Sequence, residues 1–397
     1  MRQPELSPIA SKRRFPHIIS EDESGYQRCV RCVMDTTDPL ITFDGEGVCM
    51  YCHKVEGLRK FWNPAGDPER YGRLLEKCKE DGKGREYDVI IGLSGGVDSS
   101  YVAHLAHEAG LRTLAIHCDT GWNSEMAIKN IQNVVSVCGF DFITHVVDWS
   151  EMRDLQHAFF KSGVPAQDIP QDNSIIAVFS SYARKHKIKW SLAGSNWATE
   201  SILPMAWGHV NLDKKHILAI HKRFGTKPLN KLPLISFEEY TIVNQRLYGM
   251  KVATPLNLVP YDKSSAMELL KQKFDWRYYG GKHHESRFTK FFQTWYLPHR
   301  WGFDKRLPHL SSLIVSGQMT REGALLELQQ ELLIEEEFEA DRRYMARKLQ
   351  ISDEQFEELM NVPLHSHQDY PCSSWLPLVR KLKNKYLVSV AKKESAT

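Results

Sequence analysis

The chain contains no apolar run long enough to cross a bilayer. No stretch of its 397 residues approaches a length of about eighteen consecutive apolar side chains, which is what a membrane helix requires. The first residues are polar, and the basic group 12–14 is not followed by the apolar segment of a signal peptide. We therefore expect no membrane span, no signal peptide and a cytoplasmic location.

The chain also has little excess charge of either sign. Its 52 Lys and Arg side chains are nearly balanced by 49 Asp and Glu side chains, which leaves a net charge of +3. A strongly basic stripe is the usual electrostatic signature of a nucleic-acid-binding protein. The composition therefore predicts an ordinary folded protein, and we expect neither a nucleic acid nor a membrane as a partner.

Cysteine is scarce, and half of it is concentrated in two C-x-x-C pairs. Eight cysteines in a chain of this length suit a reducing compartment better than a disulfide framework. Cys29 and Cys32 are separated by sixteen residues from Cys49 and Cys52, which is the spacing of a zinc ribbon with four thiolate ligands. Such a closed site predicts a structural or docking role for Zn²⁺, with an iron–sulfur cluster as the alternative and His53 as a surface residue.

A glycine-rich loop follows a short apolar strand pattern at 87–93, but it lacks the lysine of a Walker A sequence. Two glycines let backbone N–H groups turn toward an anion, serines add hydroxyl donors, and a helix expected over 101–110 contributes partial positive charge. An acid inside an anion site suggests that Asp98 helps to position Mg²⁺. A serine-rich turn without a ligand is the alternative. The expected nucleotide-binding residues of the loop are Ser94, Gly95, Gly96, Val97, Asp98, Ser99 and Ser100.

Strand and helix patterns alternate after the loop, which predicts an α/β fold with a doubly wound parallel sheet. Strands are expected over 112–117, 142–147 and 189–193, a final strand within 251–259, and helices over 124–138, 150–161 and 174–187. Ligands of such sheets bind beyond the carboxyl ends of the strands. By position we expect four residues there to contact nucleotide: His117, Asp119, Gly194 and Asn196.

Basic side chains crowd beside a Gly-Gly turn at 280–281. One interpretation is a polar loop that caps a helix; the other is that Lys282, Arg287 or Lys290 closes over pyrophosphate or an acidic sugar, with the group 304–306 nearby. From about residue 309 onward the pattern is helical. The expected division is a flexible arm (1–25), a zinc ribbon (26–57), a helical linker (58–84), the nucleotide domain (85–260) and a mostly helical substrate or partner region (261–397).

The motif Ser-Gly-Gly-x-Asp-Ser-Ser resembles the PP-loop of the ATP pyrophosphatase superfamily. Together with the zinc ribbon, Trp-Ala-Thr-Glu at 197–200, the stretch 280–293 and Ser-Gly-Gln-Met-Thr-Arg-Glu at 316–322, it is similar to the bacterial N-acetyl sugar amidotransferases. That family makes acetamidino sugars for lipopolysaccharide O-antigen or for flagellin glycans such as those of pseudaminic acid. The resemblance covers about Cys29 to Leu328.

The resemblance implies an enzyme that transfers AMP from ATP to the oxygen of a sugar N-acetyl group and lets ammonia displace it. It implies ATP, Mg²⁺ and structural Zn²⁺ as cofactors and an N-acetylated sugar or sugar nucleotide as substrate. The expected catalytic residues are Asp98, Lys282 and Lys290, and the expected substrate-binding residues are His283, Glu285 and Arg287.

Two other functions remain open from the sequence, a tRNA thiolation enzyme and a nucleotide-sensing scaffold. Thiolation enzymes commonly use catalytic or paired cysteines, whereas Cys78, Cys118, Cys138 and Cys372 are isolated. None of these cysteines lies on the glycine-flanked elbow of a glutaminase nucleophile. We therefore expect ammonia to come from a separate glutaminase with a synthase-like channelling subunit, partners with which the family is associated.

Overall fold

The fold is known from a computed structural model, which describes residues 24–59, 62–281, 284–330, 332 and 335–375. Its centre is a five-stranded sheet in the order β3-β2-β1-β4-β5, with every neighbouring pair parallel. The strands are β1 (Val89–Gly92), β2 (Thr113–Asp119), β3 (Asp141–Val146), β4 (Trp190–Leu192) and β5 (Lys251–Ala253). The sheet confirms the α/β class and the doubly wound parallel arrangement that the sequence predicts.

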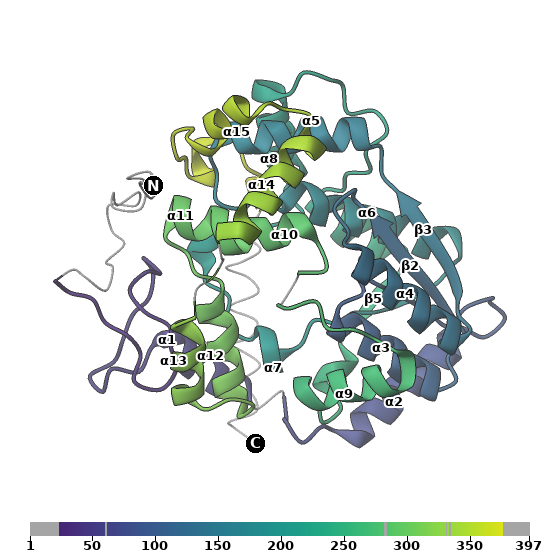
Figure 1. Cartoon of the computed structure of the whole chain (residues 1–397). Helices are drawn as coiled ribbons and strands as arrows, with labels where there is room; N and C mark the ends of the chain where they lie inside the picture. Colours follow the sequence, from purple (N-terminus) through teal and green to yellow (C-terminus); the bar gives the residue numbers. More distant parts are fainter. Residues whose placement is uncertain (1–23, 60–61, 282–283, 331, 333–334, 376–397) are drawn as a thin grey trace.

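Helices cover both faces of this sheet, and a second group of helices follows it in the chain (Figure 1). Around the sheet lie α2 (Pro68–Asp81), α3 (Val97–Glu108), α4 (Glu125–Cys138), α5 (Trp149–Ser162), α6 (Ile169–Lys185), α7 (Trp197–Glu200), α8 (Lys214–Phe224) and α9 (Lys263–Phe274). The helical region contains α10 (Arg287–Phe291), α11 (Leu297–Trp301), α12 (Arg306–Ser316), α13 (Arg321–Leu328), α14 (Glu335–Leu349) and α15 (Asp353–Met360).

Most boundaries lie within two residues of the sequence prediction, and the larger differences are at three places. Helix α3 begins at Val97, inside the glycine-rich motif, because Gly96 takes the extended conformation of an N-cap. Helix α6 begins at Ile169 rather than 174, since Pro170 suits the first turn of a helix. The final strand is only β5, and the chain then forms a 3₁₀ turn that starts at Pro255.

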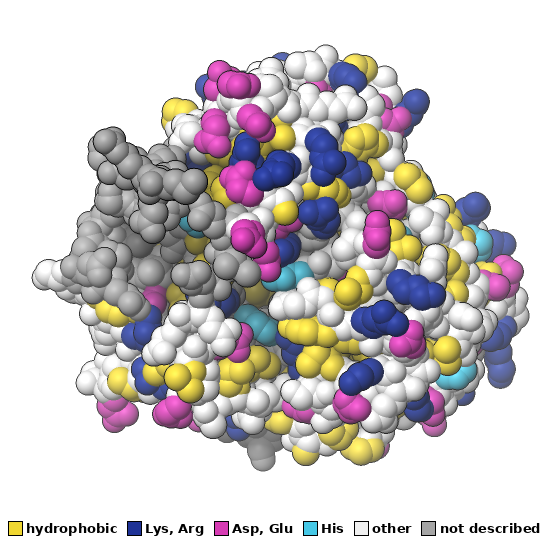
Figure 2. All heavy atoms as spheres, viewed as in Figure 1, with side chains coloured by type: hydrophobic (Ala, Val, Ile, Leu, Met, Phe, Trp, Pro, Cys, Tyr) yellow, Lys and Arg dark blue, Asp and Glu magenta, His cyan; other side chains and the backbone are white. Residues whose placement is uncertain are grey.

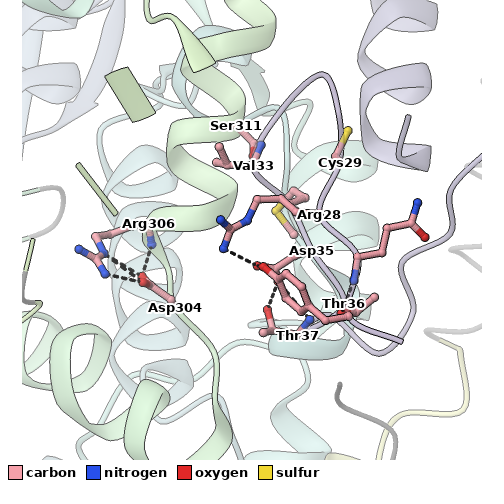
Figure 3. A network of polar contacts seen from close by, with 12 residues as sticks. Arg28, Cys29, Val33, Asp35, Thr36, Thr37, Asp304, Arg306 and Ser311 are labelled. Atoms are coloured by element: carbon pink, nitrogen blue, oxygen red, sulfur yellow. Dashed lines mark hydrogen bonds and ion pairs between the residues drawn. The ribbon is translucent and has the colours of Figure 1, made fainter. Parts of the chain in front are cut away.

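The cysteine-rich segment packs against the helical region rather than against the sheet. Its buried residues share one hydrophobic core with aromatic and aliphatic residues of α10 to α15, and α1 (Met50–Leu58) lies beside α12 and α13 in Figure 1. Val33 N–H donates to Ser311 Oγ at 3.2 Å (Figure 3), and Arg321 donates to the carbonyls of Cys29 and Cys32. The expected domain limits remain predictions.

Among the residues that the structure describes, no helix is both long enough and apolar enough to span a membrane. On the face shown in Figure 2, Lys and Arg side chains are interspersed with Asp and Glu.

Candidate functional site

The glycine-rich loop turns between β1 and the N-terminus of α3. Gly95 has φ +82°, and a Cβ placed on it would lie 2.5 Å from the carbonyl oxygen of Ala127 on α4. Its own carbonyl accepts from Trp276 Nε1–H at 2.9 Å. Glycine is therefore required here, because the loop lies directly on the first turn of α4.

Hydroxyl groups hold the loop in its curled shape. Ser94 Oγ and Ser99 Oγ lie 3.2 Å apart, and Gly96 N–H donates to Ser94 Oγ at 3.2 Å. Ser100, in contrast, is fully buried on α3 and does not line the cavities described below. The loop presents serine hydroxyls and a helix N-terminus to the space in front of it, which is the chemistry of an anion site.

Asp98 lies in the first turn of α3 and is positioned by two side chains. Tyr261 donates its hydroxyl to Asp98 Oδ1, and Asn196 Nδ2 lies 3.3 Å from the same oxygen. Burial, with Asp98 as a second cause, raises the pKa of Tyr261 well above its ordinary value. Tyr261 therefore remains a hydrogen-bond donor, and Asp98 is held as an acceptor beside the loop.

Three adjoining cavities lie near the loop, and residues of the loop line two of them. The loop cavity, of about 320 Å³, is lined by Ser94, Gly96, Asp98 and Ser99 together with Gly194, Lys263, Tyr279 and Glu285. The strand-end cavity, of about 430 Å³, is lined by Leu93, His117, Phe179, Gln171 and Asp172. The outer cavity, of about 580 Å³, is lined by Glu200, Tyr278, His284, Arg306 and His309. Neighbouring cavities share lining residues, so the three adjoin at the carboxyl edge of the sheet.

The residues expected after the second strand have different environments. His117 lines the strand-end cavity, but its Nδ1 lies 2.8 Å from Leu93 O and its Nε2 lies 2.9 Å from Asn123 Nδ2. Asp119 accepts from Gly121 N–H and Asn123 at 2.8 Å each and does not line the cavity. His117 thus presents only its ring to a ligand, and Asp119 shapes the turn.

The residues expected after the fourth strand lie directly against the loop. A Cβ on Gly194 would lie 3.1 Å from Asp98 C and Ser99 N, so this glycine lets the two segments approach closely. Asn196 caps α7 by accepting from Thr199 N–H at 2.9 Å while it contacts Asp98. The structure therefore brings Gly194 into the loop cavity and gives Asn196 a positioning contact.

Glu285 is the one described member of the 282–290 group that reaches both the loop and the strand-end cavities. A Cβ on Gly96 would lie 3.3 Å from Glu285 Oε1 and 3.1 Å from Tyr279 Oη. Burial first, and the Glu285 charge second, raise the pKa of Tyr279. The sequence offered no signal for Tyr279 beyond its place next to the Gly-Gly turn.

Arg287 and Lys290 are held by α14 and line none of the three cavities. Arg287 pairs with Asp341 at 2.9 Å and lies over the Tyr344 ring at 3.7 Å. Lys290 pairs with Glu337 at 2.8 Å and Asp341 at 3.3 Å; burial acts to lower its pKa, but these acids leave it raised. Their expected roles remain predictions, and Lys282 and His283 lie outside the described residues.

A half-buried group of acids and a lysine lies between the strand-end and outer cavities. Asp172 and Lys305 line both cavities, with Asp168 nearby. Burial, and next the charge of Asp168, raises the pKa of Asp172 to about 8, while burial lowers the pKa of Lys305. The sequence pattern indicates only Lys305, within the group 304–306, because the helix is expected to start at 174; Pro170 was the available signal for an earlier start.

The two C-x-x-C pairs converge as expected. Three sulfur–sulfur distances, between Cys29 and Cys52, Cys32 and Cys49, and Cys49 and Cys52, are 3.9, 3.6 and 3.8 Å. Four sulfurs placed about 2.3 Å from a tetrahedral ion would be about 3.8 Å apart. Backbone N–H groups of Cys32 and Cys49 point at Cys29 Sγ, which favours thiolates. The four cysteines therefore fit Zn²⁺ in size and donor type, and His53 instead contacts Asp44.

The isolated cysteines of the sheet domain are buried thiols. Burial raises the pKa of Cys78, Cys118 and Cys138 to about 12 in each case. A thiolate is the reactive form of cysteine, so these residues lack the environment of a sulfur-transfer nucleophile.

Two family models match separate parts of the chain. The model described as NAD synthase matches residues 75–230, and the model described as "LPS biosynthesis protein WbpG-like, C-terminal domain" matches residues 285–383. The first segment contains the loop and β1 to β4, and the second contains α10 to α15. The matches confirm the PP-loop and extend similarity beyond Leu328, where the sequence resemblance ended.

Curated relatives share part of this length. The chain is 29% identical over 179 residues to a GMP synthase [glutamine-hydrolyzing] of Coxiella burnetii, covering 43% of this chain and 32% of the relative. It is 26% identical over 270 residues to the GMP synthase [glutamine-hydrolyzing] of Aeromonas salmonicida, covering 64% and 47%. The chain thus spans less than half the length of these relatives.

Two solved structures show low overall superposition. The NH3-dependent NAD synthetase from Campylobacter jejuni is 18% identical with a TM-score of 0.28, covering 39% of this chain and 72% of that one. The NMN synthetase from Francisella tularensis is 17% identical with a TM-score of 0.23, covering 55% and 95%.

Proposed function

We propose that the chain is an amidotransferase-like PP-loop enzyme that converts a sugar N-acetyl group to an acetamidine, because one part of it matches an NAD synthase model and another a WbpG-like C-terminal domain. The reaction uses ATP and ammonia and releases AMP and pyrophosphate. The product serves lipopolysaccharide or another surface glycan.

The observation that carries this proposal is that three cavities adjoin at the carboxyl edge of the sheet and that the anion-binding loop lines two of them. The loop cavity suits the departing pyrophosphate, and the strand-end cavity, with Phe179 and the His117 ring, suits adenosine. The outer cavity mixes carboxylates, cations and the Tyr278 ring, which suits a sugar. Asp172 and Lys305 lie where the strand-end cavity meets the outer cavity. A sugar amide in the outer cavity can therefore approach the α-phosphate of an ATP that occupies the loop and strand-end cavities.

An amide needs this activation because its oxygen is a poor leaving group. The amide oxygen attacks the α-phosphorus, the bond from phosphorus to the pyrophosphate oxygen breaks, and an O-adenylyl imidate forms. Ammonia then adds to the imidate carbon and loses a proton, and the carbon–oxygen bond breaks to release AMP. No protein nucleophile is required; positioning and electrostatic stabilisation are sufficient.

The chain's own residues supply that positioning. Loop hydroxyls and the α3 N-terminus hold the negative charge that moves onto pyrophosphate. Asp98 offers carboxylate oxygens, the donor type of Mg²⁺, and would hold this ion, which offsets phosphate charge when bound. Lys305 can stabilise the developing charge at the α-phosphate, and the Asp172 carboxyl, with its raised pKa, can exchange a proton with the attacking nitrogen.

The nitrogen donor is ammonia delivered by another polypeptide. The names of the curated relatives include the words "glutamine-hydrolyzing", and the isolated cysteines of the sheet domain are buried. We propose a separate glutaminase and a synthase-like channelling subunit as partners.

The test is mass spectrometry of N-acetylated sugars and sugar nucleotides after incubation with the protein, ATP and ammonium. We expect a product whose mass reflects replacement of one oxygen by NH, formed in proportion to AMP. The matched control substrate carries a free amine in place of the N-acetyl group and should yield neither. AMP formation while the N-acetyl group of the substrate stays unchanged would contradict the proposal.

A further inference from the structure

A second cluster of potential metal ligands lies outside the three cavities, where the C-terminal part of the described chain packs on α8. We name it the C-terminal cluster: His209, Asp213, His216, His367 and Cys372. His216 and Asp213 are fully buried, and His367 is 7% exposed. Three separate chain segments, 209–216, 367 and 372, therefore meet at one point that the proposed reaction does not use.

One distance in this cluster matches that of a metal site, and the other ligand atoms lie close by. One potential ligand atom each from His209, His216 and Cys372 lies within 4.8 Å of the other two. Cys372 Sγ is 3.5 Å from His216 Nδ1, and a tetrahedral Zn²⁺ with bonds of about 2.3 Å to sulfur and about 2.1 Å to nitrogen places these atoms about 3.6 Å apart. At the four-cysteine site the sulfur–sulfur distances likewise match those expected around Zn²⁺.

The surrounding groups orient the ligands. Asp213 Oδ2 lies 2.8 Å from His209 Nε2, and Asp213 also accepts from the N–H groups of His216 and Ser373. His216 Nε2 lies 2.9 Å from His367 Nδ1. A partner on the second ring nitrogen is the usual support of a metal-bound histidine.

The cluster can also be satisfied without a metal, and the two states differ in proton positions. Without a metal, Ala166 N–H donates to His367 Nε2 at 3.3 Å, so the proton of the His367 ring is on Nδ1 and is donated to His216 Nε2. The proton of the His216 ring is then on Nδ1, which faces Cys372 Sγ. A metal on His216 Nδ1 requires Nε2–H to donate to His367 instead. The metal-bound state loses the hydrogen bond from Ala166 N–H and the contacts of the Cys372 thiol with the carbonyl oxygens of His367 and Tyr370 at 3.3 and 3.4 Å, and it gains metal–ligand bonds.

We propose that His209, His216 and Cys372 bind a second Zn²⁺ and that the Asp213 carboxylate orients His209. Two imidazoles and a thiolate select a borderline ion such as Zn²⁺ over Mg²⁺ or Ca²⁺, and a single thiolate does not suit an iron–sulfur cluster. The ion fastens the segment around residues 367–373 to α8, and thereby the C-terminal region to the sheet domain.

The experiment is a zinc count on the full chain, purified reduced and without chelator. We expect two Zn²⁺ per wild-type chain, one in Cys372→Ser and in His209→Gln, and two in the control Cys138→Ser, which removes an isolated buried thiol. A wild-type chain with one Zn²⁺, or a Cys372→Ser chain that keeps two, overturns the proposal.

Cobalt substitution gives a second readout that separates this site from the four-cysteine site. Thiolate-to-cobalt absorption of the wild-type chain should reflect five thiolate ligands, and that of Cys372→Ser should reflect four. If the variants do not fold, the zinc count and the cobalt absorption of the wild-type chain are sufficient. One Zn²⁺ per chain and absorption from four thiolate ligands would refute the second site.

Discussion

Replacement of Gly95 by alanine tests whether the loop must lie on α4 in order to function. A residue with a Cβ at φ +82° costs about 1–2 kcal/mol relative to glycine. The new methyl group would also lie 2.5 Å from Ala127 O, 2.9 Å from its Cα and 3.0 Å from its carbonyl carbon. Backbone atoms cannot rotate away, so overpacking adds about 1–3 kcal/mol.

The chain offers a matched control in Gly84. This glycine has φ +70°, but nothing lies within 4 Å of a Cβ placed on it. Gly84→Ala should therefore lose only the conformational part of the stability, and Gly95→Ala should lose about 2–5 kcal/mol in all. Urea unfolding of both variants measures the difference, with equal m-values as the check on the comparison.

The functional assay is pyrophosphate release at varied ATP concentration. Because Gly95→Ala moves the loop away from its seat on α4, we expect a raised KM for ATP and a reduced kcat, whereas Gly84→Ala should match the wild type. Equal stability losses in the two variants, together with an unchanged KM for ATP in Gly95→Ala, would refute the reasoning.

Three further predictions concern chemistry, pH and ammonia. Asp98→Ala should abolish AMP formation while circular dichroism shows an intact fold, because the acceptor beside the loop is lost; full activity would exclude the proposed role. In the folded chain the pKa of Asp172 is about 8, above its ordinary value of 3.8. Between about pH 4 and about pH 8 the folded chain therefore keeps a proton on Asp172 that the unfolded chain has lost. Wild-type stability should therefore fall relative to Asp172→Asn as pH rises from about 4 to about 8, by up to about 1.4 kcal/mol per pH unit, and parallel unfolding profiles would count against the raised pKa. With ammonium, turnover should rise with pH as free ammonia increases, and with glutamine the chain should be silent until its partner is added; glutamine-dependent product from the chain alone would reveal an overlooked catalytic cysteine.

The parts of the site that the sequence predicted are those encoded in local motifs. The loop of 94–100 and the C-x-x-C pairs need residues of one type at fixed spacing, so their geometry follows from the chain itself. The parallel sheet and the carboxyl-edge location of Gly194 followed from the alternation of strands and helices, since parallel sheets bind ligands at one edge.

The parts that the sequence did not predict depend on contacts between distant segments. Asp172 was missed because it lies in the first turn of α6, which begins five residues before the expected 174. The ion pairs of Arg287 and Lys290 with α14 could not be foreseen, because nothing local links residue 290 to Asp341. The C-terminal cluster likewise joins residues more than 150 positions apart.

The most direct test of the central claim follows the oxygen of the N-acetyl group. A substrate carrying ¹⁸O in that carbonyl is incubated with the protein, ATP and ammonium, and the AMP and pyrophosphate are analysed by mass spectrometry. If the amide oxygen is adenylylated and then displaced, the label appears in AMP in proportion to acetamidino product and is absent from pyrophosphate. Label that stays in the sugar while AMP accumulates, or label found in pyrophosphate, would contradict the account.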